Sequence, residues 1–351
     1  MRPSTRVRRF FLRVRAFLAR LLRRASGRLL RREAAPGRFE IGSASSLRGY
    51  VTTAPLVEPA RDYLVYVPRG WNRGKRAPLL VLCHGCRQTP EDIAALTRIA
   101  ERADREGMLV LLPRQSTQAN AWGCWNWFES NTERGAGEAA IVAAQIVEVR
   151  RRYRARREPV FVAGLSAGGA LAAVLGLRYP RLVRGVLVHS GVACGAAKSA
   201  ATALTVMRHG PDNDVLRVAD AARSATRKRP PDVALIVIHG DRDDVVAPVH
   251  AAALVAQFLR FNDGASAQDA LPSDASTQAA TPGRYPARID TWRRNGTPLV
   301  RRVQVEGLGH AWSGGDGAFA YADPNGPDAL DLFARFIADV DDPRGMPAPA
   351  R

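Results

Sequence analysis

A serine between two glycines stands where an apolar strand is expected to turn directly into a helix. Ser166 lies between Gly164 and Gly168, after an apolar run over residues 160–165. Only glycine tolerates the crowding at the flanks of so sharp a turn. Such a turn presents the serine hydroxyl at the edge of a sheet, where it is free to attack a substrate. We therefore expect Ser166 to be a nucleophile; the alternative is a glycine-rich helix start without chemistry.

A serine hydroxyl needs a base, and His310 is the best placed histidine. In a strand–turn–helix fold of this kind the acid and then the histidine follow the serine along the chain. His189 and His239 end apolar strands that precede the expected acid or coincide with it. His310 follows the last strand, in a loop at its carboxyl end, where ligands bind in such sheets. We expect His310 to be the general base.

Three carboxylates compete for the role of the acid that orients this histidine. Asp241, Asp243 and Asp244 all follow the apolar run over residues 233–239. One of them is expected to hold the imidazole in the correct tautomer and to stabilise the imidazolium. Position along the chain does not decide among the three.

Two backbone N–H groups are candidates for an oxyanion hole. Ala167 directly follows the serine, so its N–H lies beside the hydroxyl. The second donor is expected from the loop after an early strand, here the strand over residues 79–83. The N–H of Cys86 in that loop is the candidate.

An aromatic cluster over residues 122–128 is unusual for a surface loop. Trp125 and Trp127 in this cluster, and Trp312 near the expected base, are candidate substrate-binding residues on an apolar platform. The alternative is that these rings fill the core.

Apolar strands alternate with helices over most of the chain. Strands are expected over residues 63–67, 79–83, 108–112, 160–165, 183–189, 233–239 and 299–305, and helices over 90–106, 138–156, 167–178 and 328–340. This order predicts an α/β fold, a mostly parallel sheet with helices on both faces. Residues 192–231 are expected to form a cap or a long loop, and residues 262–287 a disordered insertion.

Composition and charge restrict the class of protein. The chain has 351 residues, 46% of them hydrophobic, and a net charge of +19. Twelve arginines precede the first carboxylate, Glu33, so the rest of the chain carries only +7. A nucleic-acid partner is therefore not expected. The domains expected are a basic segment over residues 1–39, a catalytic domain over 40–340 and a tail over 341–351.

The basic segment has its own pattern. Apolar residues recur every three or four positions over residues 7–22, which is typical of an amphipathic helix with arginines around its apolar face. Residues 1–32 are expected to bind a storage granule or an anionic membrane surface; the alternative is a solvated tail. The segment has no apolar run of the length found in a secretory signal.

The four cysteines favour neither a disulfide scaffold nor a metal site. Cys83 and Cys86 form a C-x-x-C pair, but the second pair that a zinc site needs is missing. Neither a metal nor a cofactor is expected.

Taken together, these motifs resemble the poly(3-hydroxybutyrate) depolymerase family of esterases, within the α/β-hydrolases. The resemblance extends from about Tyr63 to about Phe336. It depends on five blocks, which cover residues 81–88, 123–128, 163–169, 239–243 and 309–312. It implies the α/β-hydrolase fold, serine esterase activity on polyester or short-acyl esters, Asp243 as the acid and Cys86 as the oxyanion position. A disulfide between Cys86 and Cys124 and two free thiols both remain open.

Two alternatives of function and a question of location remain open. The alternative substrate class is plant-cell-wall acyl esters, feruloyl or acetyl, because a fold does not determine its substrate. A hydrolase fold that binds granules or membranes through residues 1–32 is a third hypothesis, compatible with the first. The family resemblance implies an extracellular protein, whereas the missing signal pattern indicates a cytoplasmic or granule-associated one.

Overall fold

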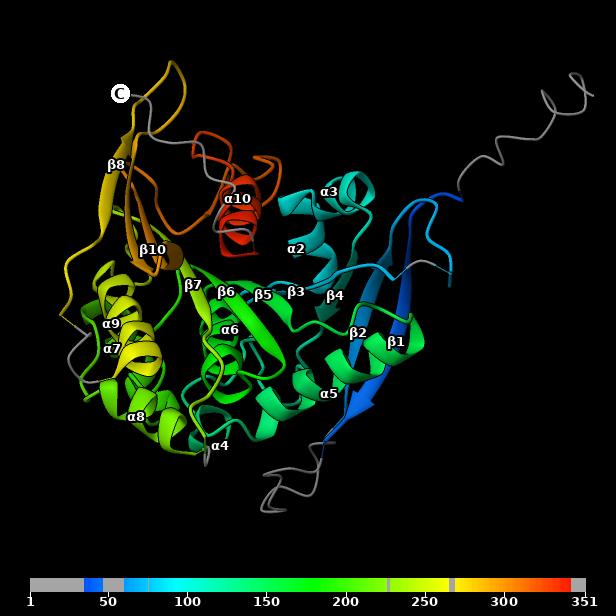
Figure 1. The fold of residues 1–351 in the computed structure, drawn as a ribbon, viewed down its shortest axis with the longest axis horizontal. Helices are drawn as coiled ribbons and strands as arrows, with labels where there is room; N and C mark the ends of the chain where they lie inside the picture. Colours follow the sequence, from blue (N-terminus) through cyan, green and yellow to red (C-terminus); the bar gives the residue numbers. More distant parts are fainter. Residues whose placement is uncertain (1–34, 47–59, 75, 226–227, 265–268, 342–351) are drawn as a thin grey trace, which may run out of the picture.

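Ten strands form one sheet through the centre of the protein (Figure 1). The computed structural model describes residues 35–46, 60–74, 76–225, 228–264 and 269–341. The strand order is β1-β2-β4-β3-β5-β6-β7-β10-β9-β8. The bounds of the strands are β1 Arg38–Ser45, β2 Ala60–Val67, β3 Leu79–Cys83, β4 Leu109–Pro113, β5 Val160–Leu165, β6 Val183–His189, β7 Ala234–Gly240, β8 Asp274–Gln278, β9 Ala287–Arg294 and β10 Thr297–Val305.

The middle of the sheet is parallel and its two margins are antiparallel. Strands β4, β3, β5, β6, β7 and β10 pair in parallel with their neighbours. On one margin β1 and β2 pair antiparallel, and on the other β9 and β8 do. The carboxyl ends of the six parallel strands therefore share one edge, where ligands bind in open sheets of this class.

Helices cover both faces of the sheet (Figure 1). On one face lie α2 Pro90–Thr97, α3 Ile99–Glu106 and α10 Ala329–Asp341. On the other face lie α4 Ser130–Glu133, α5 Gly137–Arg152, α6 Ala167–Arg178, α7 Ala200–His209, α8 Leu216–Ser224 and α9 Val249–Asp263. The prediction of a mostly parallel sheet between two helical layers is confirmed.

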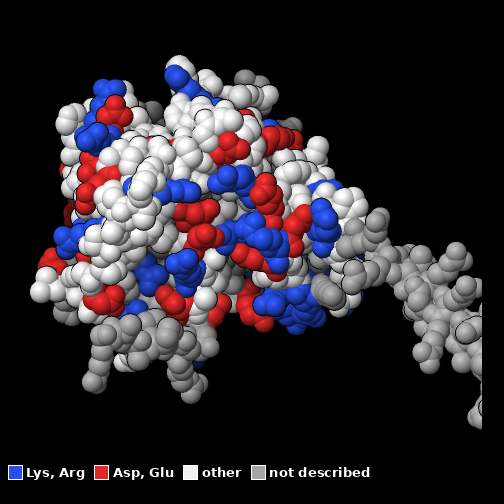
Figure 2. Space-filling model, turned by 90° about the horizontal axis from the view of Figure 1, so that it is seen from above, with Lys and Arg blue, Asp and Glu red and all other residues white. Residues whose placement is uncertain are grey.

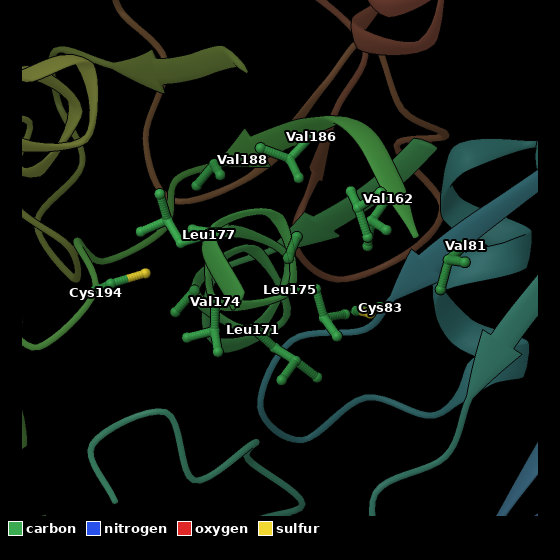
Figure 3. Close-up of a cluster of buried hydrophobic side chains, with 14 of the residues drawn as sticks. Val81, Cys83, Val162, Leu171, Val174, Leu175, Leu177, Val186, Val188 and Cys194 are labelled. Carbon is green, nitrogen blue, oxygen red and sulfur yellow. The ribbon is translucent and has the colours of Figure 1, made fainter. Parts of the chain in front are cut away.

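The core consists of two apolar layers, one on each face of the sheet. Figure 3 shows part of the larger layer, in which Leu171, Val174 and Leu175 of α6 meet Val162 of β5 and Val186 of β6. All of these side chains are buried. Because both faces of the central strands are covered, these strands read as unbroken apolar runs rather than as alternating patterns.

One predicted helix is divided into two. Thr89 caps α2, and Pro90 stands in its first turn, where its missing N–H and fixed φ are tolerated. The helix ends at Arg98, whose φ of 53° lies in the left-handed region, and α3 begins directly afterwards. The periodicity of apolar residues continues across the break, so the sequence pattern gives no sign that the helix is divided.

Residues 192–231 and 262–287, whose apolar residues show no clear periodicity, contain more regular secondary structure than the sequence indicates. Residues 192–231 contain α7 and α8. The prediction of disorder over residues 262–287 is wrong for Asp274–Gln278, which form the edge strand β8 against β9. The side chains of β8 are exposed, which explains why its sequence carries no apolar signal. The basic segment over residues 1–32 lies outside the described residues, and so does the tail after Asp341.

Charged side chains of both signs are interspersed over the surface. Figure 2 shows this for the face seen from above. Many are paired, for example Arg301 with Asp339 at 3.0 Å and Arg302 with Asp290 at 2.6 Å. Within the described ranges no helix has the length and apolar character that crossing a membrane requires.

Candidate active site

Ser166 occupies a strained turn between β5 and α6. Its φ is 55° and its ψ is −120°, a conformation that costs a residue with a side chain about 1–3 kcal/mol. A Cβ at Gly164 would lie 2.2 Å from the carbonyl oxygen of Gly168, and one at Gly168 would lie 2.4 Å from that of Cys83. Both flanking glycines are therefore required by close backbone contacts, as the motif predicts.

The loops that carry the expected acid and base are bound to each other. Arg242 N–H donates to Leu308 O at 3.1 Å, and Gly307 N–H donates to the Asp241 carboxylate at 2.7 Å. Gly240 lies so close to Leu308 O that a Cβ there would be 2.0 Å away. The loop after β7 and the loop after β10 thus form one unit at the carboxyl edge.

Within this unit, His310 is hydrogen-bonded to Asp243. Its Nδ1 lies 2.8 Å from Oδ2 and 3.0 Å from Oδ1 of the carboxylate. Asp241 is instead bonded to the backbone of Gly307, and Asp244 is exposed. Of the three carboxylates that compete in the sequence, Asp243 is thus the one that meets the histidine.

Asp243 is held as a carboxylate. Burial alone raises its pKa, but hydrogen bonds from His239 and His310 and from the N–H of Val246 outweigh that effect. The pKa of Asp243 therefore lies well below its ordinary value. The contacts are 2.8 Å from Val246 N, 3.1 Å from Val245 N and 3.3 Å from His239 Nε2.

Ser166 and His310 stand at the same edge of the sheet without a direct hydrogen bond between them in the described chain. Ser166 follows β5 and His310 follows β10, with β6 and β7 between these strands. In structures without substrate such catalytic contacts are often long and tighten only when substrate binds. The serine is buried, with 6% of its surface exposed.

The loop after β3 lies beside Ser166. A Cβ at Gly85 would be 3.5 Å from the Ser166 Cβ. The side chain of Gln88 fixes this loop by accepting the Gly85 N–H at 2.8 Å. In the described part of the chain, the N–H groups of Cys86 and Ala167 donate to no protein acceptor. Both are therefore free to bind an anion.

Cys86 is joined to Cys124 by a disulfide. Of the two alternatives that the sequence leaves open, the structure has the bonded pair, and Cys83 and Cys194 are buried free thiols. The disulfide connects the loop after β3 with the aromatic loop. Trp125 adds a second connection, because its indole N–H donates to His84 O at 3.1 Å.

The three tryptophans are in the core, which corrects their assignment as a substrate platform. Trp125, Trp127 and Trp312 are 0%, 4% and 1% exposed. Trp312 stacks on His189, with ring centroids 4.9 Å apart. All three rings pack inside the fold, and the indole of Trp125 is also hydrogen-bonded there, which agrees with the alternative that these rings fill the core. Trp122 of this loop is 61% exposed, and Phe128 is partly buried.

Sequence reasoning missed the roles of two buried histidines, His189 and His239. Both were excluded as bases by chain order, and both are nevertheless next to the site. His239 Nε2 lies 2.8 Å from Val246 O and 3.3 Å from Asp243. The position of each at the carboxyl end of an apolar strand was the available signal.

The donors of this site do not form a metal centre. Across the residues that the structure describes, no group of three or more His, Cys, Asp or Glu side chains is arranged to hold a metal ion.

The chain is similar in sequence to known esterases. Residues 61–279 match the family described as esterase PHB depolymerase. Poly(3-hydroxyalkanoate) depolymerase C of Paucimonas lemoignei is 30% identical over 70% of this chain, and feruloyl esterase B of Neurospora crassa is 27% identical over 57% of it. The aligned regions span 57% of the first relative and 71% of the second.

The fold is that of known esterases. The acetyl xylan esterase from Aspergillus awamori superposes with a TM-score of 0.60 at 20% identity, covering 77% of this chain and 94% of that one. The family match includes Ser166 and Asp243 and ends before His310, whose contact with Asp243 is seen in the structure. The match over more than half of the chain establishes that it belongs to the PHB depolymerase family of esterases, with an α/β-hydrolase fold.

Proposed function

We propose that the protein is a serine esterase that hydrolyses carboxylic esters through an acyl-enzyme. Ser166 Oγ attacks the ester carbonyl and His310 accepts its proton at Nε2. Asp243 orients the ring and stabilises the imidazolium. The N–H groups of Ala167 and Cys86 stabilise the oxyanion of the tetrahedral intermediate.

The second half of the reaction uses the same groups in reverse. The imidazolium of His310 protonates the alcohol as it leaves, and the acyl group stays on Ser166. His310 then takes a proton from water as the water oxygen attacks the acyl carbon. When the second tetrahedral intermediate collapses, the bond between the acyl carbon and Ser166 Oγ breaks, His310 returns the proton to Oγ, and the acid is released. Water is the one co-reactant of the ester in these steps.

The observation that carries this proposal is the bond between His310 and Asp243. Two loops 67 residues apart meet at the edge where Ser166 stands, with an imidazole on an ionised carboxylate at 2.8 Å. Replacing Ser166 with Ala is expected to abolish hydrolysis of p-nitrophenyl butyrate. Unchanged hydrolysis by folded Ser166→Ala would refute the assignment.

We propose esters of short 3-hydroxy acids, including poly(3-hydroxybutyrate), as the substrate class. The similarity to the Paucimonas depolymerase over 70% of this chain supports it. Feruloyl and acetyl esters of cell-wall polysaccharides are the second candidate, supported by the similarity to the Neurospora esterase. Rates on 3-hydroxybutyrate oligomers, feruloyl esters and acetylated xylan separate the two.

Residues 1–32 support a further part of the proposal, binding to a granule or an anionic lipid surface. The support is the helical spacing of apolar residues among twelve arginines. Deleting residues 1–32 is expected to abolish sedimentation with anionic vesicles or polyester granules and to leave hydrolysis of soluble esters intact.

We also propose an oxidising, extracellular location for the catalytic domain. The disulfide between Cys86 and Cys124 supports it, since such bonds persist mainly in oxidising compartments.

A further inference from the structure

His189 lies between the nucleophile and the acid. It is the last residue of β6, and β6 lies between β5, which leads to Ser166, and β7, which leads to Asp243. His310 has to act across the end of this strand. The imidazole of His189 is fully buried and has no part in the proposed chemistry.

We propose that His189 is a positioning residue that holds the His310 loop in register with the Ser166 turn. This inference depends on the proposed esterase function. It assigns a task to a side chain that touches neither the substrate nor the reacting atoms.

The first half of the connection is to the nucleophile. The backbone carbonyl of His189 accepts the N–H of Ser166 at 2.9 Å. The backbone of Ser166 is strained, and this hydrogen bond is one of the contacts that hold it in that conformation. The position of the Ser166 hydroxyl is therefore fixed relative to the end of β6.

The second half is to the base. His189 Nε2 accepts the N–H of Ser313 at 2.9 Å, and its ring stacks on Trp312 at 4.9 Å between centroids, with 23° between the planes. Trp312 and Ser313 follow His310 by two and three residues and form the short strand β11. One side chain thus supplies both a polar and an apolar contact to the loop that carries the base.

The connection requires a neutral imidazole with its proton on Nδ1. Only that tautomer leaves Nε2 free to accept, and Nδ1 then donates toward Ser190 Oγ at 3.3 Å. Burial lowers the pKa of His189 to about 3, with smaller contributions from His239 and His310 in the same direction and from Asp243 in the opposite one. The hydrogen-bond geometry and the lowered pKa thus both favour a neutral ring.

Two substitutions separate the two contacts. His189→Phe keeps a ring that can stack on Trp312 and removes the acceptor for Ser313 N–H. His189→Gln keeps an acceptor and removes the stack. His250→Phe is the control for loss of a buried imidazole. His250 is equally buried, and its ring bonds Val206 O on α7 and the N–H of Ala193 rather than the loop that carries His310.

We expect His189→Phe to lower kcat on p-nitrophenyl butyrate about 10- to 100-fold with KM within twofold, since a displacement of about 1 Å at a catalytic group costs that much. His189→Gln should recover part of the loss. Labelling of Ser166 by a fluorophosphonate should slow by a similar factor. All rates are measured below the melting temperature of every variant.

Three results would overturn the inference: kcat within twofold of the wild type in both variants, a loss in His189→Phe no larger than in His250→Phe, or a rise in KM at constant kcat. The proposed function is judged separately by Ser166→Ala. Activity that survives in Ser166→Ala refutes the esterase assignment, whereas an inactive Ser166→Ala beside a fully active His189→Phe refutes the positioning role alone.

Discussion

At the scale of single residues, the site depends on one buried carboxylate that stays ionised. Asp243 accepts two backbone N–H groups and two imidazoles, and these contacts hold its pKa well below the ordinary value in spite of burial. Its charge is therefore expected to persist to a lower pH than that of an ordinary aspartate. In the proposed mechanism the chemical identity of this side chain matters more than its protonation state.

Replacing Asp243 with Asn is expected to lower kcat about 10³- to 10⁴-fold. An amide that donates toward Nδ1 favours the wrong tautomer of His310 and no longer stabilises the imidazolium. Steady-state kinetics on p-nitrophenyl butyrate measures the loss. Asp244→Asn, at the exposed neighbour, should stay within twofold of the wild type. Equal rates in the two variants would contradict the assignment of the acid.

At the scale of elements, the loop after β3, which carries the proposed oxyanion donor, is fixed by a covalent bond rather than by regular secondary structure. The disulfide of Cys86 and Cys124 closes a loop of 38 residues. Buried Glu138 supports the same region by accepting the N–H of Asn126 at 2.7 Å and the amide of Gln115 at 2.5 Å. The position of the Cys86 N–H group thus depends on contacts with residues that are distant in the sequence.

Reducing this disulfide is expected to destabilise the protein by about 3–4 kcal/mol, the entropy of a loop of that length. It should also lower kcat more than KM rises, because the oxyanion donor becomes less well placed. Thermal melting and esterase kinetics with and without a phosphine reductant test both effects. Cys86→Ser with Cys124→Ser should reproduce them; an unchanged melting temperature would show that the bond contributes nothing.

The regular elements could be predicted from the sequence, whereas several elements at the margins could not. The central strands are apolar on both faces, so their runs are continuous and their ends are clear. Exposed β8 has no such signal, and neither does the break at Arg98. These features depend on tertiary contacts and on single backbone conformations.

Some residues of the candidate site could likewise be predicted from the sequence, and others could not. Ser166 can be proposed as the nucleophile because its motif is local, and His310 as the base because of chain order. Asp243 was distinguished from its neighbours only by family resemblance, since the choice depends on how two loops meet. Trp125 was assigned to the substrate platform because an irregular loop has no periodic pattern from which the buried side chains can be predicted.

At the scale of the whole molecule, three buried neutral histidines make the fold sensitive to acid. Burial lowers the pKa of His84 and of His250 to about 4 and that of His189 to about 3. In the unfolded chain a histidine has a pKa of about 6.5. Between about pH 6.5 and pH 4 the unfolded state therefore binds protons that the native state does not.

Because the unfolded state binds more protons, the free energy of unfolding falls as the pH is lowered through that window. Each such histidine contributes about 1.4 kcal/mol per pH unit. Carboxylates with lowered pKa, such as Asp243, lose their contribution only at still lower pH. Buried Glu138, whose pKa is raised chiefly by burial, acts in the opposite direction. Comparing histidine variants with the wild type separates the contribution of the histidines to the pH dependence from that of these carboxylates.

We expect the free energy of unfolding, measured in guanidinium chloride at pH 7, 6 and 5, to fall with pH in the wild type. His250→Gln should reduce the slope below pH 6 by about one proton, or about 1.4 kcal/mol per pH unit, because a buried group that titrates only after unfolding has been removed. His209→Gln, at an exposed histidine, should leave the slope unchanged. If His250→Gln kept the slope of the wild type, the buried histidines would not be the origin of the acid sensitivity.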